Sequence, residues 1–357
     1  MVDLNDVKGI RALDSLGSLA ATEDYPAQFA LGLELAEKWQ LPQDMKKDYD
    51  EIVVLGTGGG SSIAGALLPS LFFHQLKQPV IITQGYNLPA FADNNTLAIA
   101  ISHSGNTEEI LATVAQAQER GCPMLAITAG GKLADICKEQ NIPVVLVPLD
   151  IGHPRRNLGY IVPPLVVALA ELGLVEDISG DIRETIGLMA DWVQTYRVET
   201  PLEQNPAKQL ALDLKGHIPL IYGSSDHLQA PAWRWKNQFG ENSKLMAFYN
   251  LIPHLHHDEA VGWDMEEGLL KKFFLIMLRD SELDDERIAK RKDITTDMLR
   301  QRLGGASQVF ARGQSLFARL FSLITLGDFV SLYGAIARGI DPTPVEVINL
   351  FKEKMGQ

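Results

Sequence analysis

The most informative stretch of this chain reads Ile101-Ser102-His103-Ser104-Gly105-Asn106-Thr107-Glu108-Glu109. The apolar run before it predicts a buried strand, and residues 108–120 predict a helix with acidic residues in its first turn. A strand that ends where a helix begins leaves backbone N–H groups unpaired and places the positive end of the helix dipole at the corner. Ser102, Ser104 and Thr107 can each donate to a phosphate oxygen, and the loop contains no Lys or Arg. The loop therefore predicts a phosphate site built on hydrogen bonds rather than on fixed charge.

The same alternation of strand and helix continues outward from this loop in both directions. Apolar runs that predict strands lie at residues 52–55, 79–82, 97–101, 124–127 and 144–147. Amphipathic segments that predict helices lie between most of these runs, at residues 62–73, 108–119 and 132–138. Short apolar strands separated by such helices are typical of parallel βαβ units, in which helices cover both faces of the sheet.

The second half of the chain shows this pattern in a looser form. Strands are predicted at residues 218–225, 245–249, 273–278 and 307–310, and helices at residues 316–338 and 345–355. The first of these strands ends in a Gly-Ser-Ser corner before a helix, so both halves share one local order, which suggests a duplication. We therefore predict an α/β protein with two domains, residues 1–190 and 191–357. Each domain should contain a mainly parallel sheet flanked by helices.

Composition and charge exclude several classes of protein. The chain has 357 residues, 46% of them hydrophobic, and a formal net charge of −13. This charge argues against a general nucleic-acid binder, which needs a basic surface, although one helix N-terminus can still hold a phosphate. The most apolar run, residues 161–174, is too short to span a bilayer, and no signal peptide begins the chain. Cys122 and Cys137 form neither a disulfide framework nor a metal-type spacing, so we expect free thiols in a reducing cytoplasm. Since no apolar run is long enough to span a bilayer, we also expect no membrane partner.

A glycine-rich turn follows the first predicted strand and reads Gly56-Thr57-Gly58-Gly59-Gly60-Ser61-Ser62. A dinucleotide-binding G-x-G-x-x-G pattern would need a third glycine where this chain has Ser61. It would also need an acid at the end of the second strand, where the chain reads Thr83-Gln84-Gly85. The turn therefore predicts no nucleotide cofactor. Its glycines instead allow the backbone to approach a sugar phosphate closely.

Five blocks of sequence carry a resemblance to a known family. Residues 102–109 resemble the S-x-S-G-x-T loop of sugar isomerase (SIS) domains. The other blocks are residues 154–160 (P-R-x-x-L-G-Y), 234–244 (R-W-K-x-Q-x-x-E-N-S-K), 253–259 (P-x-L-x-H-[ND]-E) and 338–344. Together the five blocks, which extend over most of the chain, are similar to the bifunctional phosphoglucose/phosphomannose isomerases.

This resemblance implies two SIS domains, of which the first holds the glycine-rich turn and the phosphate loop. The second would hold the catalytic base and the C-terminal helix. The family works as a homodimer with shared active sites and needs neither metal nor cofactor. It interconverts glucose 6-phosphate, and also mannose 6-phosphate, with fructose 6-phosphate through a cis-enediol.

The resemblance also assigns the residues that would hold the substrate phosphate. They are Ser102, Ser104, Thr107 and Ser61, together with the backbone of Gly59 and Gly60. This chain departs from the family's G-x-G-G-S by an extra glycine before Ser61, which leaves Ser62 as an alternative. A second departure is Gly240, where relatives often have Asn.

Aldose–ketose isomerisation needs a base, a fixed cation and a group that opens the sugar ring. One carboxylate can move a proton between C2 and C1 on one face of the enediol, and Glu241 is at the matching motif position. A cation stabilises the negative charge of the enediolate. Arg155 matches the family's arginine, whereas its neighbour Arg156 does not. Histidine suits ring opening near neutral pH, so His257 is the first candidate for that step and Lys352 the second.

Three other interpretations compete with this one. The cluster His254, His256, His257, Asp258 and Glu259 invites a zinc site, but its spacing on a predicted loop lacks the H-E-x-x-H pattern, so we predict no metal. A non-catalytic sugar-phosphate sensor would not need the predicted base, cation and ring-opening residues together. An amidotransferase-like aminosugar isomerase would normally carry a glutaminase domain with an N-terminal cysteine nucleophile. Neither Cys122 nor Cys137 fits that role, so only a free-standing isomerase of another phosphosugar stays open.

Overall fold

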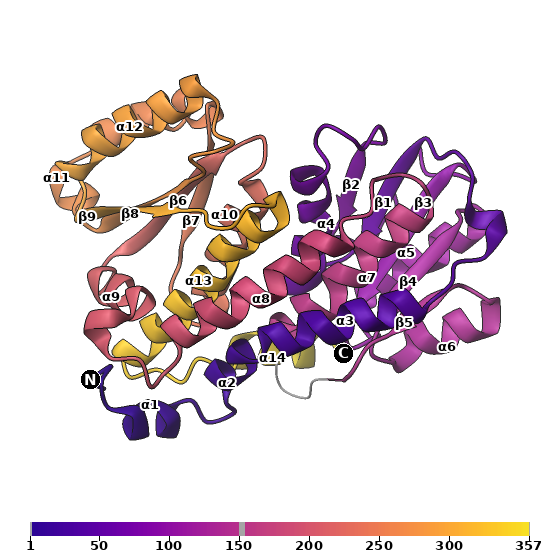
Figure 1. Ribbon diagram of the computed structural model, residues 1–357, viewed down its shortest axis with the longest axis horizontal. Coiled ribbons are helices and arrows are strands. Elements are labelled where there is room, and N and C mark those ends of the chain that lie inside the picture. Colours follow the sequence, from indigo (N-terminus) through magenta and orange to yellow (C-terminus); the bar gives the residue numbers. More distant parts are fainter. Residues whose placement is uncertain (1, 150–153, 357) are drawn as a thin grey trace. The chain divides into compact units, whose positions relative to one another are not determined.

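The computed structural model describes residues 2–149 and 154–356, and the chain divides into two compact units. The N-terminal unit comprises Asp24–Ile186 and Lys352–Gln357, and the C-terminal unit comprises Met1–Glu23 and Gly187–Phe351. Figure 1 shows a sheet flanked by helices in each unit, which confirms the predicted α/β class. The predicted boundary between residues 190 and 191 stays a prediction, because compactness alone does not show which segments fold independently.

The sheet of the N-terminal unit has five parallel strands in the order β2-β1-β3-β4-β5. The strands are β1 (Glu51–Leu55), β2 (Val80–Thr83), β3 (Thr96–Ser102), β4 (Met124–Thr128) and β5 (Val144–Leu146). Each coincides with a predicted strand to within one or two residues at either end. Every residue of β3 is buried, as expected for a central strand with helices on both faces.

Helices cover both faces of this sheet. Helices α5 (Glu108–Glu119) and α6 (Gly131–Gln140) pack on one face, where Ile110 and Val114 meet the small side chains of the central strands. Helices α4 (Gly58–Leu71), α7 (Leu158–Glu171) and α3 (Tyr25–Lys38) form the other layer. Successive side chains of each strand therefore pack into two different cores, one on each face of the sheet, as the apolar runs predicted.

Two glycines let α3 and α7 pack with their backbones in contact. A Cβ atom added to Gly32 of α3 would lie 2.1 Å from the carbonyl oxygen of Gly159, and one added to Gly159 would lie 2.6 Å from the Cβ of Gln28. Neither position can hold a side chain. Since α7 follows directly on the segment that carries the two candidate arginines, this close contact fixes where that segment ends.

The sheet of the C-terminal unit has four parallel strands in the order β7-β6-β8-β9. The strands are β6 (Ile218–Ser224), β7 (Phe248–Ile252), β8 (Phe273–Arg279) and β9 (Gly305–Phe310). Helix α12 (Glu286–Arg300) covers one face, and α10 (Gln229–Glu241) covers the other and packs on α13 (Leu316–Ala337) (Figure 1). Helix α13 is the one described helix that is long and apolar enough to cross a membrane, but 94% of its apolar window is buried, as in a core helix.

The N-terminal segment of the chain packs within the C-terminal unit. It contains α1 (Val7–Leu13) and α2 (Ser18–Glu23), and α2 packs on α13. The backbone N–H of Leu202 donates to Asn5 Oδ1 (2.8 Å), and Arg11 pairs with Glu199 (2.9 Å). The remaining helices are α8 (Ser179–Tyr196), which spans both units, α9 (Pro206–Asp213), α11 (Glu267–Leu270) and α14 (Glu346–Met355). Short 3₁₀ turns lie at Gln43–Met45 (η1) and Leu202–Gln204 (η3).

Two elements start three or more residues away from the predicted position. Helix α4 begins at Gly58, four residues earlier than predicted, because the glycine-rich turn itself forms the first helical turn. Strand β7 begins at Phe248, three residues later than predicted. Lys244 has a left-handed backbone (φ 51°), and the N–H of Leu245 donates to the carbonyl of Phe239, so these residues close the end of α10 instead.

Candidate functional site

The predicted phosphate loop forms a compact hydroxyl-lined corner between β3 and α5. The hydroxyls of Ser102 and Thr107 lie 3.0 Å apart, and the N–H of Gly105 donates to Ser102 Oγ (3.1 Å). The N–H of Asn106 donates to Ser104 Oγ (3.3 Å). Ser102 is buried, Thr107 is half-buried and Ser104 is exposed, so the three hydroxyls extend from the sheet to the surface. The corner offers donors at the N-terminus of a helix, where an anion is stabilised.

The neighbouring strand connection holds this loop in place. The N–H of Leu133 donates to the carbonyl of Gly105 (2.9 Å), and the N–H of Lys132 donates to Asn106 Oδ1 (3.2 Å). Gly105 has φ +66°, and a Cβ atom there would lie 1.7 Å from the carbonyl oxygen of Gly130. The loop is therefore fixed before any ligand arrives, and only glycine fits at its centre.

The strand order brings the glycine-rich turn next to this loop. Strand β1 lies between β2 and β3, so the chain leaves β1 toward one side of the sheet and β3 lies on the other side. The connections on either side of such a switch point diverge and leave a crevice at the carboxyl ends of the two strands, where ligands of open α/β sheets bind. The glycine-rich turn follows β1 and the phosphate loop follows β3, so the two predicted parts meet at the switch point.

The two serines of the glycine-rich turn have different surroundings. Both lie in the first turn of α4, where Gly58 has a left-handed backbone (φ +79°). The hydroxyl of Ser62 is fully buried and donates to the carbonyl of Gly58 within the helix. Ser61 keeps 8% of its surface exposed, at the edge of the corner. Of the two alternatives, Ser61 therefore has the more accessible hydroxyl.

The segment with the candidate arginines packs against the same helix. Arg155 and Arg156 lie in the 3₁₀ turn η2 (Pro154–Arg156), which packs on α4 in the N-terminal unit. The side chains of both are almost fully buried, with 5% and 1% of their surface exposed. Two buried guanidinium groups therefore lie beside the glycine-rich helix. The turn, the loop and Arg155 thus all lie within the N-terminal unit.

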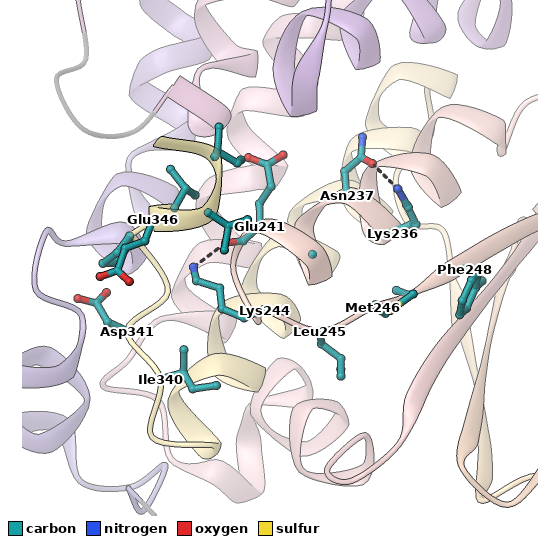
Figure 2. A pocket seen from close by; sticks show the side chains of 16 residues that line it. Lys236, Asn237, Glu241, Lys244, Leu245, Met246, Phe248, Ile340, Asp341 and Glu346 are labelled. Atoms are coloured by element: carbon teal, nitrogen blue, oxygen red, sulfur yellow. Dashed lines mark hydrogen bonds between the residues drawn. The ribbon is translucent and has the colours of Figure 1, made fainter. Parts of the chain in front are cut away.

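The candidate base lies in the C-terminal unit at the end of a well-supported helix. Glu241 is the last residue of α10, is half-buried and lines a cavity of about 920 Å³ (Figure 2). Lys244 donates to the carbonyl oxygens of Glu241 (2.7 Å) and Pro342 (2.8 Å), which closes the turn after the helix. Figure 2 shows Asp341 and Glu346 on the segment that forms another wall of this cavity.

Buried contacts fix α10 to α13 along its length. Arg234 donates to both carboxylate oxygens of Asp328 (3.0 and 2.7 Å), and both side chains are fully buried. Trp235 is also fully buried, and its indole N–H donates to the carbonyl of Leu323 (2.8 Å). The helix that ends at Glu241 is therefore held rigidly, as a catalytic position requires.

His257 follows a 3₁₀ turn, η4 (His254–His256), after β7, and its side chain is exposed. Its neighbours hold this turn in place. Arg291 Nη1 donates to His256 Nδ1 (3.1 Å), so the proton is on Nε2, which donates to Thr295 Oγ1 (2.8 Å). Partial burial and the positive charge of Arg291 lower the pKa of His256. His256 is thus a neutral support for the turn.

Glu259 is a second support that the sequence did not single out for this role. Its carboxylate accepts from the hydroxyl of Tyr222 and from Asn250 Nδ2 (2.7 Å), two residues of the neighbouring strands β6 and β7. A short 3₁₀ turn, η5 (Ala260–Asp264), follows it. No sequence pattern marks Tyr222 or Asn250, since each contacts Glu259 only after the strands pair.

The remaining predicted residues lie at the surface. Lys352 is exposed on α14, and His254 is exposed and lies 3.2 Å from Asp258. Across residues 2–149 and 154–356, no three His, Cys, Asp or Glu side chains gather as a metal site. The histidine cluster that invited a zinc site therefore divides between structural and exposed roles.

A hydroxyl-lined loop at the switch point of a parallel sheet, with a second parallel sheet in the same chain, defines a tandem SIS-domain protein. Residues 47–143 match the SIS domain family, and residues 203–355 match the bacterial phospho-glucose isomerase C-terminal SIS domain. The chain belongs to the family of bifunctional phosphoglucose/phosphomannose isomerases.

Individual relatives support this membership. The bifunctional phosphoglucose/phosphomannose isomerase of Caldicellulosiruptor bescii is 41% identical over 87% of this chain and 91% of its own. That of Thermoplasma acidophilum is 34% identical over 86% of this chain and 90% of its own. Among solved structures, a hypothetical protein from Thermus thermophilus has a TM-score of 0.72 at 16% identity, over 98% of this chain and 94% of that chain. This last likeness is one of fold.

Proposed function

We propose that this protein interconverts glucose 6-phosphate and mannose 6-phosphate with fructose 6-phosphate. The observation that carries the proposal is the hydroxyl corner of Ser102, Ser104 and Thr107 at the switch point, beside the glycine-rich turn, in a chain of this family. Hydrogen-bond donors at a helix N-terminus bind a phosphate dianion, and Ser61 with the backbone of Gly59 and Gly60 supplies the other side of the cradle. The phosphate is thereby anchored away from the reacting carbons.

The chemical step needs one carboxylate. Glu241 takes the proton from C2 of the open-chain aldose. The C2–H electrons form the C1–C2 double bond while the π electrons of the C1 carbonyl move onto O1, which gives the enediolate. The same carboxylic acid returns the proton to C1, while the proton of the O2 hydroxyl passes to O1, which leaves the C2 ketone of fructose 6-phosphate. Arg155 stabilises the negative charge that develops on the enediolate oxygens. Its planar guanidinium suits two neighbouring oxygens.

Ring opening comes before this step. His257 donates a proton to the ring oxygen while the O1 hydroxyl loses one, and Lys352 is the second candidate for that task. The exposure of both side chains is compatible with delivery to a site that another copy completes. The reaction uses no metal or other cofactor, and because charged sugar phosphates do not cross bilayers unaided, we propose the cytoplasm as its place.

We further propose a homodimer with shared active sites. Helix α14 exposes Val347 (81%), Phe351 (69%) and Leu350 (50%), and Met246 (73%) in the cavity beside it is also exposed. Apolar side chains gathered at this density are typical of a surface that another protein covers. A second copy is the occupant that the shared-site chemistry requires.

A coupled assay in excess EDTA tests the function. Turnover of both aldose phosphates would support the bifunctional assignment and the metal-free mechanism. Turnover of glucose 6-phosphate alone would keep the mechanism and limit the aldose substrate to glucose 6-phosphate. Binding without turnover would favour a sugar-phosphate sensor instead.

The Glu241→Gln variant tests the assigned base. It should lower kcat by about 10³-fold or more while KM changes little, because the carboxylate is needed only for proton transfer. Glu267→Gln, an exposed acid on α11, is the matched control and should keep full activity. Undiminished turnover by Glu241→Gln would remove this residue from the mechanism.

A further inference from the structure

The two sheets repeat one topology, so each part of the first has a counterpart in the second. The orders β2-β1-β3-β4 and β7-β6-β8-β9 are the same, every pair is parallel, and α10 and α12 take the places of α4 and α5. The C-terminal unit therefore has its own switch point, at the carboxyl ends of β6 and β8. An α/β sheet binds ligands at such a point, and nothing in the proposed reaction uses this one.

Asp280 occupies this second corner. It is the first residue after β8, and its side chain is fully buried. Its Oδ1 accepts from the backbone N–H groups of Glu282 (3.1 Å) and Leu283 (3.2 Å), two residues of the loop that precedes α12. The loop amides of a strand-to-helix corner thus point at a carboxylate, where the corresponding loop of the N-terminal unit presents donors to a ligand.

Arg319 and His227 lie against the same carboxylate. Arg319 Nε donates to both Asp280 oxygens (2.9 Å each), and its Nη2 also donates to Oδ1. His227, from the turn after β6, directs Nε2 to within 3.4 Å of Oδ2 without a well-formed hydrogen bond to any described group, although only 7% of its surface is exposed. Burial raises the pKa of Asp280, but His227 and Arg319 outweigh it and hold the pKa well below its usual range.

A second buried pair closes the corner from the side of α12. Lys292 Nζ donates to both oxygens of Asp284 (2.6 and 2.8 Å), and Asp284 also accepts from the N–H of Asp280 (3.0 Å) and from Ser224 Oγ (3.3 Å). Ser224 ends β6, so residues from both central strands take part.

We propose that this corner is a second anion-binding site whose ligand position is held by the protein's own Asp280 carboxylate. The elements of a phosphate site are present. They are backbone N–H groups of the loop, an arginine that donates to two oxygens, and a histidine whose Nε2 makes no well-formed hydrogen bond. The internal carboxylate takes the place of the ligand, so each chain binds one sugar phosphate and binds it in the N-terminal unit. The count of one sugar phosphate per chain rests on the phosphate loop proposed above, whereas the second anion site does not depend on it.

Removal of the carboxylate should open the site to an added anion. In the full-length protein, Asp280→Ala leaves Arg319 buried and unpaired, which lowers the melting temperature. Inorganic phosphate, or formate as the smallest replacement for the missing carboxylate, should then restore stability. We expect about 20 mM of either anion to raise the melting temperature by about 3 °C more than chloride at equal ionic strength. All variants carry Ser104→Asp, which places a carboxylate in the first phosphate loop and suppresses its own response.

Asp328→Ala is the matched control. It breaks an equally buried Arg–Asp pair, but that pair joins two helices and lies at no strand end. It should lose stability without any rescue by phosphate or formate. If Asp280→Ala does not fold alone, the refolded soluble fraction with and without phosphate gives the same comparison, and Asp280→Ala with Arg319→Met should fold but ignore both anions. Equal responses of the Asp280 and Asp328 variants, or two phosphates bound per parent chain, would overturn the proposal.

Discussion

Arg291 donates to Nδ1 of His256 across 3.1 Å, and this bond decides which imidazole nitrogen carries the proton. Protonation of His256 would place a second positive charge against the guanidinium and break the contact. The pKa of His256 is lowered in the folded state by burial first and by Arg291 second. The turn that carries His257 is therefore sensitive to acid.

The lowered pKa makes the contribution of His256 to the stability of the fold depend on pH. As the pH falls below about 6.5, the unfolded chain takes up the proton of this histidine before the folded chain does. The stabilising contribution of His256 is thus complete above that pH and is lost as the pH falls toward the lowered native pKa. The melting temperature of the parent should fall between about pH 7.5 and pH 5.5. That of His256→Asn should fall by about 1 to 2 °C less over the same range. His254→Asn, an exposed neighbour, should follow the parent, and an identical slope for His256→Asn would contradict the prediction.

Gly105→Ala should disable the phosphate loop. The left-handed backbone and the 1.7 Å approach of a new Cβ to Gly130 force the loop open. We expect KM for fructose 6-phosphate to rise about 10-fold or more, which corresponds to about 1.4 kcal/mol of lost binding. Gly121→Ala has the same strained backbone (φ +70°) but no atom within 4 Å, so it should cost about 1 kcal/mol of stability and leave KM unchanged. A KM that rises equally in both would show that the loop is not the phosphate site.

Arg155→Met and Arg156→Met should separate the two neighbouring arginines. Loss of a cation that stabilises the enediolate should lower kcat by about 10²-fold. The Arg156 side chain is only 1% exposed, so its replacement should act on the melting temperature and leave kcat of the folded protein within about three-fold of the parent. Steady-state kinetics at a temperature where both variants are folded make the comparison. The opposite pattern would assign the catalytic role to Arg156.

Lys244→Met tests whether the turn after α10 positions Glu241. The ammonium group joins the carbonyl oxygens of Glu241 and Pro342, so its loss should let the end of the helix fray. We expect kcat to fall about 10-fold while KM and the melting temperature change little, since a misplaced base costs rate and not binding. Lys236→Met, from the same cavity wall, is the control. Equal kinetics of the two variants would exclude a positioning role.

The fold was predictable where the sequence pattern is local. The strands of the first sheet are apolar runs and the helix 108–119 is an amphipathic run, and each is long enough to be recognised from its local pattern. The observed bounds of each lie within a few residues of the predicted ones. Helix α12 was not predicted, because it is highly polar and only a few residues such as Ile288 and Leu299 face the core. Strand β7 contains Asn250 and an exposed Phe248, so its pattern is weak.

The candidate site was predictable where residues share a loop, and less so where the fold brings them together. Ser102, Ser104 and Thr107 lie within six positions, so their local pattern is enough to identify the corner. The hydrogen bond between Glu259 and Tyr222 joins residues 37 positions apart in the sequence, and the one between Asp280 and Arg319 joins residues 39 positions apart. Such pairs depend on strand order, which residue spacing does not encode.

The first 23 residues belong to the compact unit whose strands come last, and this affects the order in which the protein is made. Asn5 and Arg11 contact Leu202 and Glu199, and α2 packs on α13, which begins at Leu316. On the ribosome, α2 therefore emerges nearly 300 residues before α13, on which it packs, and it must stay undocked while the whole N-terminal unit is synthesised. The beginning of the chain is thus among the last parts to reach its place.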